Sequence, residues 1–416
     1  MSEWIASLRV RGLVQDHTPL PDRPEALGAM YVGIDPTADS LHIGHLAPLQ
    51  LLYHLAQLGI HPIVVIGGAT ARVGDPSGRK SERPLLPPEV VQQNAQKIAA
   101  QVQRLLPFPF TLLDNYEWIG GLSLLDFLRE VGKFITVSYL LSKETVLSRL
   151  ESGISFTEFS YPLLQAYDFY YLCRHRGCRL QIGGADQWGN ITTGIELIRK
   201  LTGEEVYGLT CPLLTRADGT KFGKSDSGDN IWLDPTKTSP YKFYQFWFNQ
   251  SDADIPMLLK VFSWRPLQEI QAILEDQAKT PERRLAQRTL AYEMTARVHG
   301  EDIAQSVQRA SEVVFGAGDL AELERLPATL LEAIANDMPH YTWAEPNLPV
   351  LDILVRIGFL RSKSEGRQLL LQGGLSVNRQ RIADERQTLA AIPPLRGRYW
   401  LIQRGKKHLA WLSILT

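Results

Sequence analysis

Short apolar, β-rich runs alternate with amphipathic segments over the first half of the chain. Between the runs, apolar positions recur with the spacing of one helix face. The runs lie at residues 29–34, 62–67, 108–113, 179–182 and 205–213. Strands that alternate with helices predict an α/β fold, here a Rossmann-like parallel sheet with crossover helices. Ligands of such sheets bind beyond the carboxyl ends of the strands, so the residues after each run are the first candidates for a site.

The pattern becomes helical and more charged after Pro240. Residues 251–262, 266–276 and 281–315 carry the apolar stripe of amphipathic helices and predict an all-α unit. Residues 316–347 contain three prolines, two glycines and many acids, so we expect a linker with some helix there.

A small α+β unit is predicted from about Leu348. A helical stripe ends at Gly358, a capping box at Ser362 begins a second helix, and two glycines lead into a strand at residues 375–377. The chain is therefore divided into a Rossmann-like domain at 1–220, a loop and helical domain at 221–315, a linker at 316–347 and a C-terminal domain at 348–416.

Composition excludes several classes of protein. With 416 residues, 44% hydrophobic and 21% charged, the chain is typical of a globular protein of about two to four domains, and disorder and collagen are excluded. Its three cysteines fit neither a disulfide framework nor a zinc site, so we expect buried reduced thiols. No run of 18 apolar residues and no signal peptide is found, which predicts a cytoplasmic protein without a membrane span.

The formal net charge of −1 is the sum of two unlike parts. Residues 351–416 hold 12 Lys and Arg against 4 Asp and Glu, which leaves a net −9 on residues 1–350. A neutral total would argue against a nucleic-acid partner, but a basic C-terminal segment favours one.

The letters HIGH follow the first predicted strand, at residues 42–45. We expect Ser40 to cap a helix there, which places His42 and His45 on one face of its first turn. Backbone N–H groups and the helix dipole favour an anion at that end, and Gly44 leaves room for a flat ligand. Either histidine alone would more often be structural, but the pair in this place favours a nucleotide.

Two lysines lie in the glycine-rich segment DGTKFGKSDSG, residues 218–228. Three glycines predict a mobile loop, and Lys221 and Lys224, three residues apart, can both reach one polyphosphate. Taken alone, the segment could equally be a solvated basic loop.

A polar stripe and two glycine-bearing loops complete the candidate site. Tyr161, Gln165 and Asp168 fall on one face of a helix whose first turn would contain Pro162, and they suit a zwitterion with a polar tail. An outward-facing solvated stripe is the alternative. The glycine-bearing loops after the second and fourth strands permit close backbone approach, and Asp186 in the latter suits ribose hydroxyls.

These motifs resemble those of class I aminoacyl-tRNA synthetases, where HIGH and a KMSKS loop act on ATP. The KFGKS variant, the polar stripe and the basic C-terminal unit are similar to the bacterial-type tyrosyl-tRNA synthetases, from Tyr31 to the C-terminus. The tryptophanyl relatives lack the C-terminal RNA-binding unit. The resemblance implies a tyrosine–tRNA ligase, which makes tyrosyl adenylate and pyrophosphate from L-tyrosine and ATP and then transfers tyrosine to the 3′ end of tRNA(Tyr).

The resemblance also implies roles for individual residues. The phenol of tyrosine would be bound by Tyr31 and Asp168, its ammonium by Asp75, Tyr161 and Gln165, and its carboxylate near Gln187. The catalytic set would be Thr37, His42, His45, Lys221 and Lys224. ATP would also contact Gly33, Asp35, Gly44, Asp186 and Lys224, with Arg79 and Arg83 as weaker candidates for its phosphates. The role of Asp35 beside both substrates stays open.

Partners follow from the same resemblance. The helical domain would meet the anticodon, and phosphates of tRNA(Tyr) would contact Arg356, Arg361, Lys363, Arg367, Arg379 and Arg381. Mg2+ would accompany ATP, with no metal site on the protein and no tightly bound cofactor. The apolar segment at residues 127–156 could be internal core, but the resemblance favours a homodimer interface. We expect no editing domain.

Two residues depart from the pattern of the family. Val32 stands where some members have a cysteine near the ribose. Pro48 lies inside the HIGH helix, where we expect it to remove the hydrogen bond to the carbonyl of Gly44, kink the helix and change ATP affinity locally.

Two other functions compete with this interpretation. A different HIGH-type nucleotidyl transferase would not explain Asp168 with Tyr31 or the basic tail. An RNA-binding scaffold without activity would not need His42, His45 and the two lysines of the loop.

Overall fold

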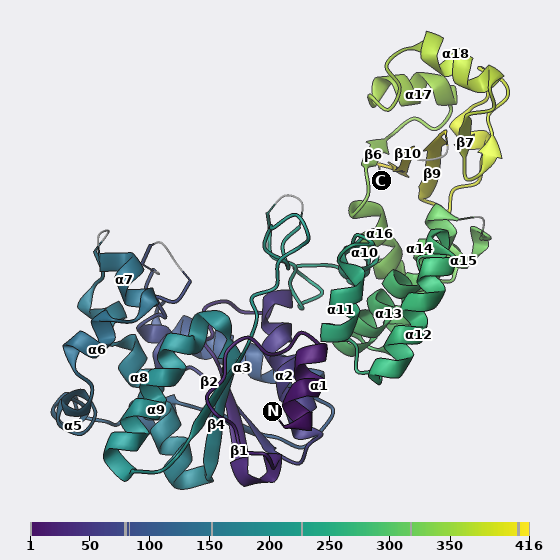
Figure 1. The fold of residues 1–416 in the computed structure, drawn as a ribbon. Helices are drawn as coiled ribbons and strands as arrows, with labels where there is room; N and C mark the ends of the chain where they lie inside the picture. Colours follow the sequence, from purple (N-terminus) through teal and green to yellow (C-terminus); the bar gives the residue numbers. More distant parts are fainter. Residues whose placement is uncertain are drawn as a thin grey trace. The chain divides into compact units, whose positions relative to one another are not determined.

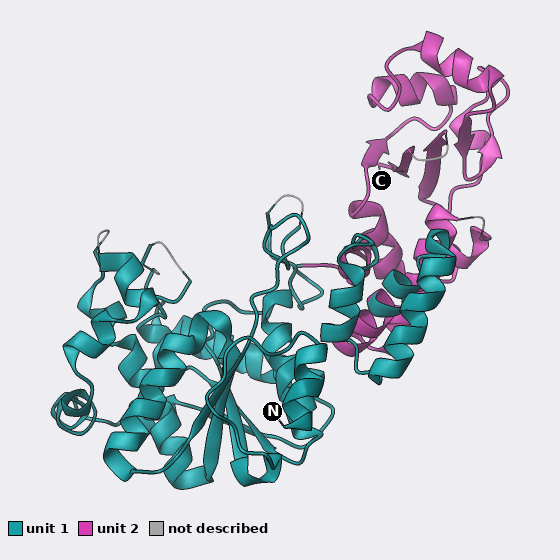
Figure 2. Ribbon diagram, in the orientation of Figure 1, with its two compact units in different colours: residues 1–237, 247–290 teal, residues 238–246, 291–416 magenta. Residues whose placement is uncertain are grey.

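The computed structural model describes residues 2–78, 81–82, 84–150, 153–225, 228–316, 318–405 and 408–415. These residues form two compact units, Met1–Lys237 with Trp247–Leu290, and Thr238–Phe246 with Ala291–Thr416 (Figure 2). The divisions fall just before α10 (Pro240–Phe248), within α10 and within α13 (Leu285–His299).

Unit 1 is built on a five-stranded parallel sheet with the order β3-β2-β1-β4-β5 (Figure 1). The strands are β1 (Ala29–Ile34), β2 (His61–Ile66), β3 (Thr111–Asp114), β4 (Cys178–Gly184) and β5 (Tyr207–Cys211). Each overlaps one of the predicted runs, so the α/β prediction is confirmed. Burial of the central strands explains why their sequences are continuously apolar rather than alternating.

The strand order reverses between β1 and β4. From β1 the chain passes to β2 and β3 on one side, then returns past β1 to β4 and β5 on the other. Such a reversal opens a crevice at the carboxyl ends of the strands. The HIGH segment follows β1 and the segment containing Asp186 follows β4, so both motifs meet at this crevice.

Unit 1 also contains the helices that lie before, between and after these strands in the chain. The longer ones are α1 (Glu3–Val10), α2 (Leu46–Ala56), α3 (Pro88–Leu105), α8 (Phe156–Arg176), α9 (Trp188–Thr202), α11 (Ile255–Phe262) and α12 (Leu267–Lys279), and the shorter ones are α4 (Tyr116–Ile119), α5 (Leu124–Glu130), α6 (Val137–Leu141) and α7 (Glu144–Leu150). Helix α8 packs on the sheet through Phe169, whose ring centroid lies 5.5 Å from that of Tyr31 in β1. This contact fixes the helix that carries the polar stripe.

Unit 2 contains α14 (Glu301–Phe315) and a second five-stranded sheet with the order β6-β10-β9-β7-β8. Its other elements are α15 (Ala321–Glu324), α16 (Ala328–Asn336), β6 (His340–Trp343), α17 (Val350–Arg356), α18 (Lys363–Leu371), β7 (Leu375–Val377), β8 (Gln380–Arg381), β9 (Tyr399–Arg404) and β10 (His408–Ile414). The expected α+β unit is present, and Ser362 caps α18 as predicted by accepting a hydrogen bond from Glu365 N at 3.2 Å.

Residues 316–347, expected as a linker with some helix, contain the helices α15 and α16 and the strand β6. Helix α16 buries Leu331 and Ile334, and β6 pairs with β10 in parallel. The prolines that suggested a linker stand at element borders: Pro327 directly precedes α16 and Pro339 directly precedes β6. Proline is tolerated at such borders, so its presence did not exclude structure.

Helix α8 begins earlier than the sequence predicted. The Ser155 side chain accepts a hydrogen bond from Glu158 N at 3.2 Å and caps the helix there. Pro162 therefore lies inside the helix rather than in its first turn. The serine followed three residues later by glutamate was the signal that the prediction missed.

Among the described residues, no helix is long and apolar enough to cross a membrane. Cys173, Cys178 and Cys211 are buried free thiols, as expected.

A buried ion pair ties α7 to the start of α8. Arg149 Nη2 lies 2.9 Å from Glu158 Oε2, and their side chains are only 4% and 1% exposed. Removing one partner of such a pair leaves a charge buried without compensation, which costs several times more than losing a surface pair. The pair therefore holds the first turn of the helix that presents Tyr161.

We expect Glu158→Gln to lower the free energy of unfolding by about 3 kcal/mol, because the Arg149 charge would stay buried without its partner. Urea unfolding followed by tryptophan fluorescence measures this difference. The control is Glu144→Gln, the same change at an exposed position of α7. Equal unfolding curves for the two variants would contradict the prediction.

Candidate active site

The helix after β1 begins later than predicted, and the two histidines cap it themselves. A short 3-10 helix (Ile43–His45) follows His42, and α2 continues from there. His42 Nδ1 accepts a hydrogen bond from the backbone N–H two residues on, at 3.0 Å, and His45 Nδ1 accepts one from His42 N at 3.1 Å. The expected Ser40 cap is absent: the Ser40 hydroxyl is buried and accepts a hydrogen bond from Gln101 instead.

This cap determines the protonation of His42. Because Nδ1 accepts a hydrogen bond, the hydrogen of the neutral ring is on Nε2. Burial, and then the nearby charge of Lys224, lower the pKa of His42 to about 4. A Cβ at Gly44 would lie 2.8 Å from the His42 ring, so glycine is needed for the cap. At pH 7 His42 can therefore donate one hydrogen bond to a ligand.

Pro48 lies in the first turn of α2, which continues directly from the 3-10 helix Ile43–His45. Proline has no N–H to donate to the preceding turn, so the bond to the carbonyl of Gly44 is missing there, and the effect on ATP affinity stays a prediction. Val32 is buried in β1, and both Val32 and Pro48 line the main cavity.

The chain of the KFGKS loop lies against the HIGH turn. Ile43 N donates to Ile231 O at 3.0 Å, and a bridge joins Lys224 to Asn230. Gly223 has φ +97°, which favours glycine, and a Cβ there would approach Gly44 N at 3.6 Å. These backbone contacts bring the two motifs together although about 180 residues separate them.

An aromatic anchor holds the middle of the same loop. The ring of Phe222, between the two lysines in sequence, packs at 5.5 Å from Trp247 and 5.8 Å from Phe262 between ring centroids. The flanking Lys221 and Lys224 are both exposed. The apolar residue thus fixes the loop while the lysines face solvent.

Asp168 lies buried on α8 near the phenol of Tyr31. Its two carboxylate oxygens accept hydrogen bonds from Asn115 Nδ2 at 3.0 Å and Trp118 Nε1 at 2.8 Å. Burial raises the pKa of Asp168 to about 7, although the two donors lower it. Burial and then the Asp168 charge raise the pKa of Tyr31 well above its usual value. Tyr31 and Asp168 therefore place two polar groups in the lining of the main cavity, in otherwise apolar surroundings.

Asp35 is held between two hydroxyl groups. Its carboxylate accepts hydrogen bonds from Thr70 Oγ1 at 2.7 Å and Tyr161 Oη at 2.8 Å. A Cβ at Gly67 would lie 2.0 Å from Asp35 Oδ1, so the glycine after β2 makes room for this carboxylate. Asp35 therefore connects the HIGH strand to the polar stripe of α8.

A third carboxylate, Asp75, is joined to the loop after β4 by amide groups. Gln187 Nε2 donates to Asp75 Oδ2 at 2.7 Å, and Asn190 Nδ2 donates to Gln165 Oε1 at 3.1 Å. Burial, and then the Asp75 charge, raise the pKa of Asp186 in the same loop. The residues predicted for the ammonium and carboxylate of an amino acid thus form one network.

These groups line a single cavity of about 620 Å3 at the carboxyl edge of the sheet. All the residues predicted to bind tyrosine or ATP line it except Lys224, which lies on the loop beside it: Tyr31, Gly33, Asp35, Thr37, His42, Gly44, His45, Asp75, Tyr161, Gln165, Asp168, Asp186, Gln187 and Lys221. Arg79 and Arg83 lie outside the described residues.

Sequence reasoning missed four donors that orient these carboxylates and amides. They are Thr70, Asn115, Trp118 and Asn190. Asn115 directly follows β3, so the rule that pointed to the other strand ends could have found it. Trp118 gives no signal of its own, because an indole is far more often core than a hydrogen-bond donor to a site.

The predicted tRNA contacts divide into two groups. Five of the basic side chains are exposed in the C-terminal unit: Arg356, Arg361, Lys363, Arg367 and Arg381. Lys363 and Arg367 form surface ion pairs with Asp352 and Glu385, both at 2.6 Å. Arg381 also donates one hydrogen bond, to Leu370 O at 3.4 Å, but its side chain is exposed. Arg379 differs, because it is only half-exposed and its guanidinium donates to three carbonyls at and after the end of α14, those of Val313, Gly316 and Gly318.

Two family models match the chain. The family model for class I tRNA synthetases (W and Y) matches residues 25–316, and that for the tyrosine–tRNA ligase SYY-like C-terminal domain matches residues 330–412. The chain is 46% identical to the tyrosine–tRNA ligase of Anaeromyxobacter dehalogenans (strain 2CP-1), with 100% of both chains covered. It is 47% identical to that of Geobacillus stearothermophilus, covering 97% of this chain and 98% of the relative.

Solved structures agree with the sequence comparisons. A C-terminally truncated mitochondrial tyrosyl-tRNA synthetase of Aspergillus nidulans superimposes with a TM-score of 0.67 and 32% identity, covering 75% of this chain and 94% of that one. The tyrosyl-tRNA synthetase of Archaeoglobus fulgidus, at 19% identity and a TM-score of 0.54, shares the fold. From the matched families, the full-length identity and the site at the strand ends, the chain belongs to the tyrosine–tRNA ligase family of class I aminoacyl-tRNA synthetases.

Proposed function

We propose that this chain joins L-tyrosine to tRNA(Tyr) in two steps, and that both substrates of the first step bind in the 620 Å3 cavity. The observation that carries the proposal is the buried carboxylate of Asp168 beside Tyr31, oriented by two neutral donors. A buried acceptor that a ligand leaves unpaired is costly, so this end of the cavity favours a side chain with a hydroxyl group.

The amino acid would lie across the polar stripe of α8. Its phenol would meet Asp168 and Tyr31, and its ammonium would meet the acceptors of Asp75 and Gln165. Its carboxylate would lie near Gln187, on the side of the HIGH turn. Support comes from the hydrogen-bonded network that joins Gln187 to Asp75 and, through Asn190, to Gln165. The network fixes the ammonium site before tyrosine arrives, which lowers the cost of binding.

ATP would lie along the HIGH turn and the loop after β4. Its phosphates would meet Thr37, His42, Lys221 and Lys224, and its ribose would meet Asp186, Gly33 and His45. Its adenine would contact the apolar wall of Pro48, Leu213 and Leu214, which lines the same cavity. Mg2+ would arrive on the ATP, because this ion keeps water and phosphate ligands and needs few from protein. Among the described residues, no cluster of three or more His, Cys, Asp or Glu could hold a metal.

In the first step, a carboxylate oxygen of tyrosine attacks the α-phosphorus and pyrophosphate leaves. The carboxylate is already ionised at pH 7, so no general base is needed. Catalysis then depends on holding the reacting atoms in line and on donors aimed at the phosphates. The neutral His42 offers Nε2–H, and the lysines of the anchored loop offer positive charge.

We assign tRNA binding to the remainder of the chain. The helices at residues 240–315 would meet the anticodon, and the five exposed basic residues of the C-terminal unit would contact phosphates. Arg379 is left out of that surface because of its bonds to backbone carbonyls. We place the protein in the cytoplasm, where buried thiols stay reduced.

We also propose a homodimer that uses the segment between β3 and α8. Some apolar residues that suggested an interface are internal, since Ile135 and Leu140 are buried in a local core. Exposed apolar side chains nevertheless gather between residues 124 and 156: Leu124, Leu125, Leu128, Val137, Leu147, Leu150 and Phe156. They make up seven of the fourteen large exposed apolar residues of the described chain, and such a concentration marks an interface.

ATP–pyrophosphate exchange with each amino acid in turn tests the proposed function. Exchange that depends on tyrosine alone is expected. Exchange without an amino acid would favour another HIGH-type nucleotidyl transferase, and no exchange at all would favour an RNA-binding scaffold.

The affinity for tyrosine should depend on the ionisation of Asp168. With its pKa near 7, the carboxyl of the free enzyme is mostly protonated at pH 6 and mostly ionised at pH 8. Protonation places a hydrogen on one carboxyl oxygen and removes the negative charge, so only the ionised form is a strong acceptor for the phenol. We expect the KM for tyrosine in exchange to rise about ten-fold from pH 8 to pH 6. In Asp168→Asn the KM should be high at both values, and an equal pH dependence there would contradict the assignment.

The turnover of exchange should not follow a titration of His42. Its pKa of about 4 keeps the ring neutral from pH 6 to pH 8, so kcat at saturating substrates should stay nearly constant. His42→Asn retains a capping acceptor but loses the Nε2 donor, and should lower kcat about 100-fold with little change in the KM for tyrosine. The control is His61→Gln, a change at the amino end of β2. A kcat that His42→Asn leaves unchanged would exclude the phosphate role.

A charge on the exposed apolar segment should separate the dimer. Leu125 on α5 is 77% exposed, and Leu125→Asp would bury an unpaired carboxylate in the proposed interface. Light scattering at micromolar concentration should give twice the chain mass for the parent and the chain mass for the variant. Leu371→Asp, at an 85% exposed leucine of α18, should remain dimeric. A monomeric parent would refute the interface.

A further inference from the structure

The segment that follows the KFGKS loop lies along the HIGH turn. One hydrogen bond runs from Ile43 N to Ile231 O at 3.0 Å, and another runs from Leu233 N to Leu41 O at 2.9 Å. These four residues flank Trp232 in the segment and the first histidine of HIGH in the turn. The backbone therefore holds Trp232 directly opposite that histidine.

The side chains of this segment alternate between two environments. An antiparallel bridge pairs Trp232 with His42, so neighbouring side chains of the segment point to opposite faces. Ile231 and Leu233 are only 2% and 4% exposed, whereas Trp232 between them is half-buried. The two apolar neighbours thus anchor the segment in the core and leave the indole on the side of the HIGH turn.

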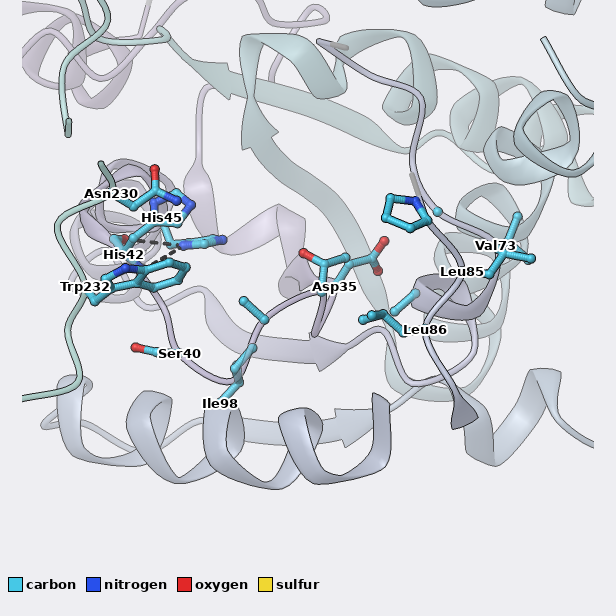
Figure 3. Close-up of a pocket in the computed structure, with 15 residues that line it drawn as sticks. Asp35, Ser40, His42, His45, Val73, Leu85, Leu86, Ile98, Asn230 and Trp232 are labelled. Atoms are coloured by element: carbon cyan, nitrogen blue, oxygen red, sulfur yellow. Dashed lines mark hydrogen bonds between the residues drawn. The ribbon is translucent and has the colours of Figure 1, made fainter. Parts of the chain in front are cut away.

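The indole of Trp232 packs against the His42 ring. Their centroids lie 5.8 Å apart and their planes meet at 74°, and Figure 3 shows the indole beside the imidazoles of His42 and His45. Aromatic pairs favour such an edge-to-face arrangement. The contact therefore adds a second constraint on a ring that the hydrogen bond at Nδ1 already ties to the backbone.

A cation in turn contacts the indole. Lys237 Nζ lies 5.0 Å from the centre of the Trp232 ring, which is within the range of a cation–π contact. The same ammonium group lies 2.5 Å from Asp39 Oδ1, and Asp39 precedes His42 by three residues. The indole is therefore connected to the stretch before the HIGH helix at two places, through His42 and through Lys237.

Trp232 is placed to act through His42 and not on a substrate. Of these two described residues, only His42 lines the main cavity. A hydrogen bond at Nδ1 alone lets the imidazole tilt, and the direction of Nε2–H tilts with it. The His45 ring, with its centroid 4.0 Å from that of His42, and the indole together limit this tilt.

The indole also contributes to the burial of His42. Burial is the main cause of the lowered pKa of His42, and the Lys224 charge comes second. Without the indole, water would reach the ring and the pKa of His42 would rise towards its ordinary value of about 6.5. The charged and titratable groups around His42 come from the KFGKS loop, the HIGH turn and the segment after the loop: Lys221, Lys224, Asp35, Asp39, His45, Asp234 and Lys237.

We propose that Trp232 is a positioning residue for the first step, which aims Nε2–H of His42 at the phosphates of ATP and shields the imidazole from water. The inference rests on the proposed function, because it assumes that His42 meets a phosphate. It adds to the reaction a residue that contacts neither substrate, and it gives the segment after the KFGKS loop a part in catalysis.

The experiment measures ATP–pyrophosphate exchange at saturating ATP and tyrosine from pH 6 to pH 8. Trp232→Ala should lower kcat about ten-fold at pH 8 with little change in the KM for tyrosine, because a misdirected donor is lost mainly from the transition state. From pH 8 to pH 6 its kcat should fall by a further two- to four-fold, about the loss of neutral imidazole expected near the ordinary pKa of histidine. The parent should stay nearly constant.

Two further variants serve as controls. Trp232→Phe keeps an aromatic ring against His42, and should restore most of the parent kcat and its flat pH profile. Trp343→Ala removes a half-buried tryptophan from β6 in unit 2, and should leave exchange unchanged. If Trp232→Ala does not fold, Trp232→Gln takes its place. Loss of folding in both variants would make the indole structural and overturn the proposal.

A double variant shows whether the effect passes through the imidazole. Adding Trp232→Ala to His42→Asn should lower kcat by about two-fold at most and leave the profile flat, because the ring to be positioned is absent. Equal losses in both backgrounds, or an acid limb that persists without His42, overturn the proposal. An unchanged kcat in Trp232→Ala also overturns it. If the parent shows no exchange that depends on tyrosine, it is the proposed function that fails.

Discussion

The parallel pairing of β1 with β4 is the constraint on which the site depends. It places the ends of two strands from distant parts of the sequence side by side, with helices leaving in opposite directions. The HIGH turn and the loop containing Asp186 are therefore neighbours whatever lies between them in sequence. Glycines at the strand ends then decide how closely groups approach, as at Gly67 after β2, where any Cβ would collide with Asp35.

Carboxylates line the cavity, among them the buried Asp75 and Asp168, and the hydrogen bonds described for three of them come from neutral donors. Asp168 is held by an amide and an indole, Asp35 by two hydroxyls, and Asp75 by side-chain amides. Neutral donors orient a carboxylate without cancelling its charge, so attraction is retained for a cationic ligand. A zwitterion brings its own ammonium group to this environment. The raised pKa of Asp168 is the cost of the arrangement, and burial is its main cause.

The sequence predicted the sheet and most of the cavity, because both depend on local signals. Apolar runs marked the strands, and motifs at their ends marked the residues that converge there. It failed where a residue's role depends on what lies across the fold. Trp118 on α4 donates to Asp168 on α8, which the sequence cannot show because the two helices are far apart along the chain. Arg379 donates to carbonyls at the end of α14, such as that of Val313, for which the sequence gives no signal either. Pro327 suggested a linker, whereas it directly precedes α16. A proline at the start of a helix and a proline in an unstructured segment cannot be distinguished from the sequence alone.

The histidines of the HIGH turn show why structure and chemistry cannot be separated there. A serine at His42 could cap the turn, and a lysine could meet a phosphate, but neither could do both. An imidazole accepts from the backbone through Nδ1 and, for that reason, keeps its hydrogen on Nε2. Burial holds the ring neutral, so the cap is not lost by protonation near pH 7. Gly44 is part of the same arrangement, since a side chain there would displace the His42 ring that caps the helix.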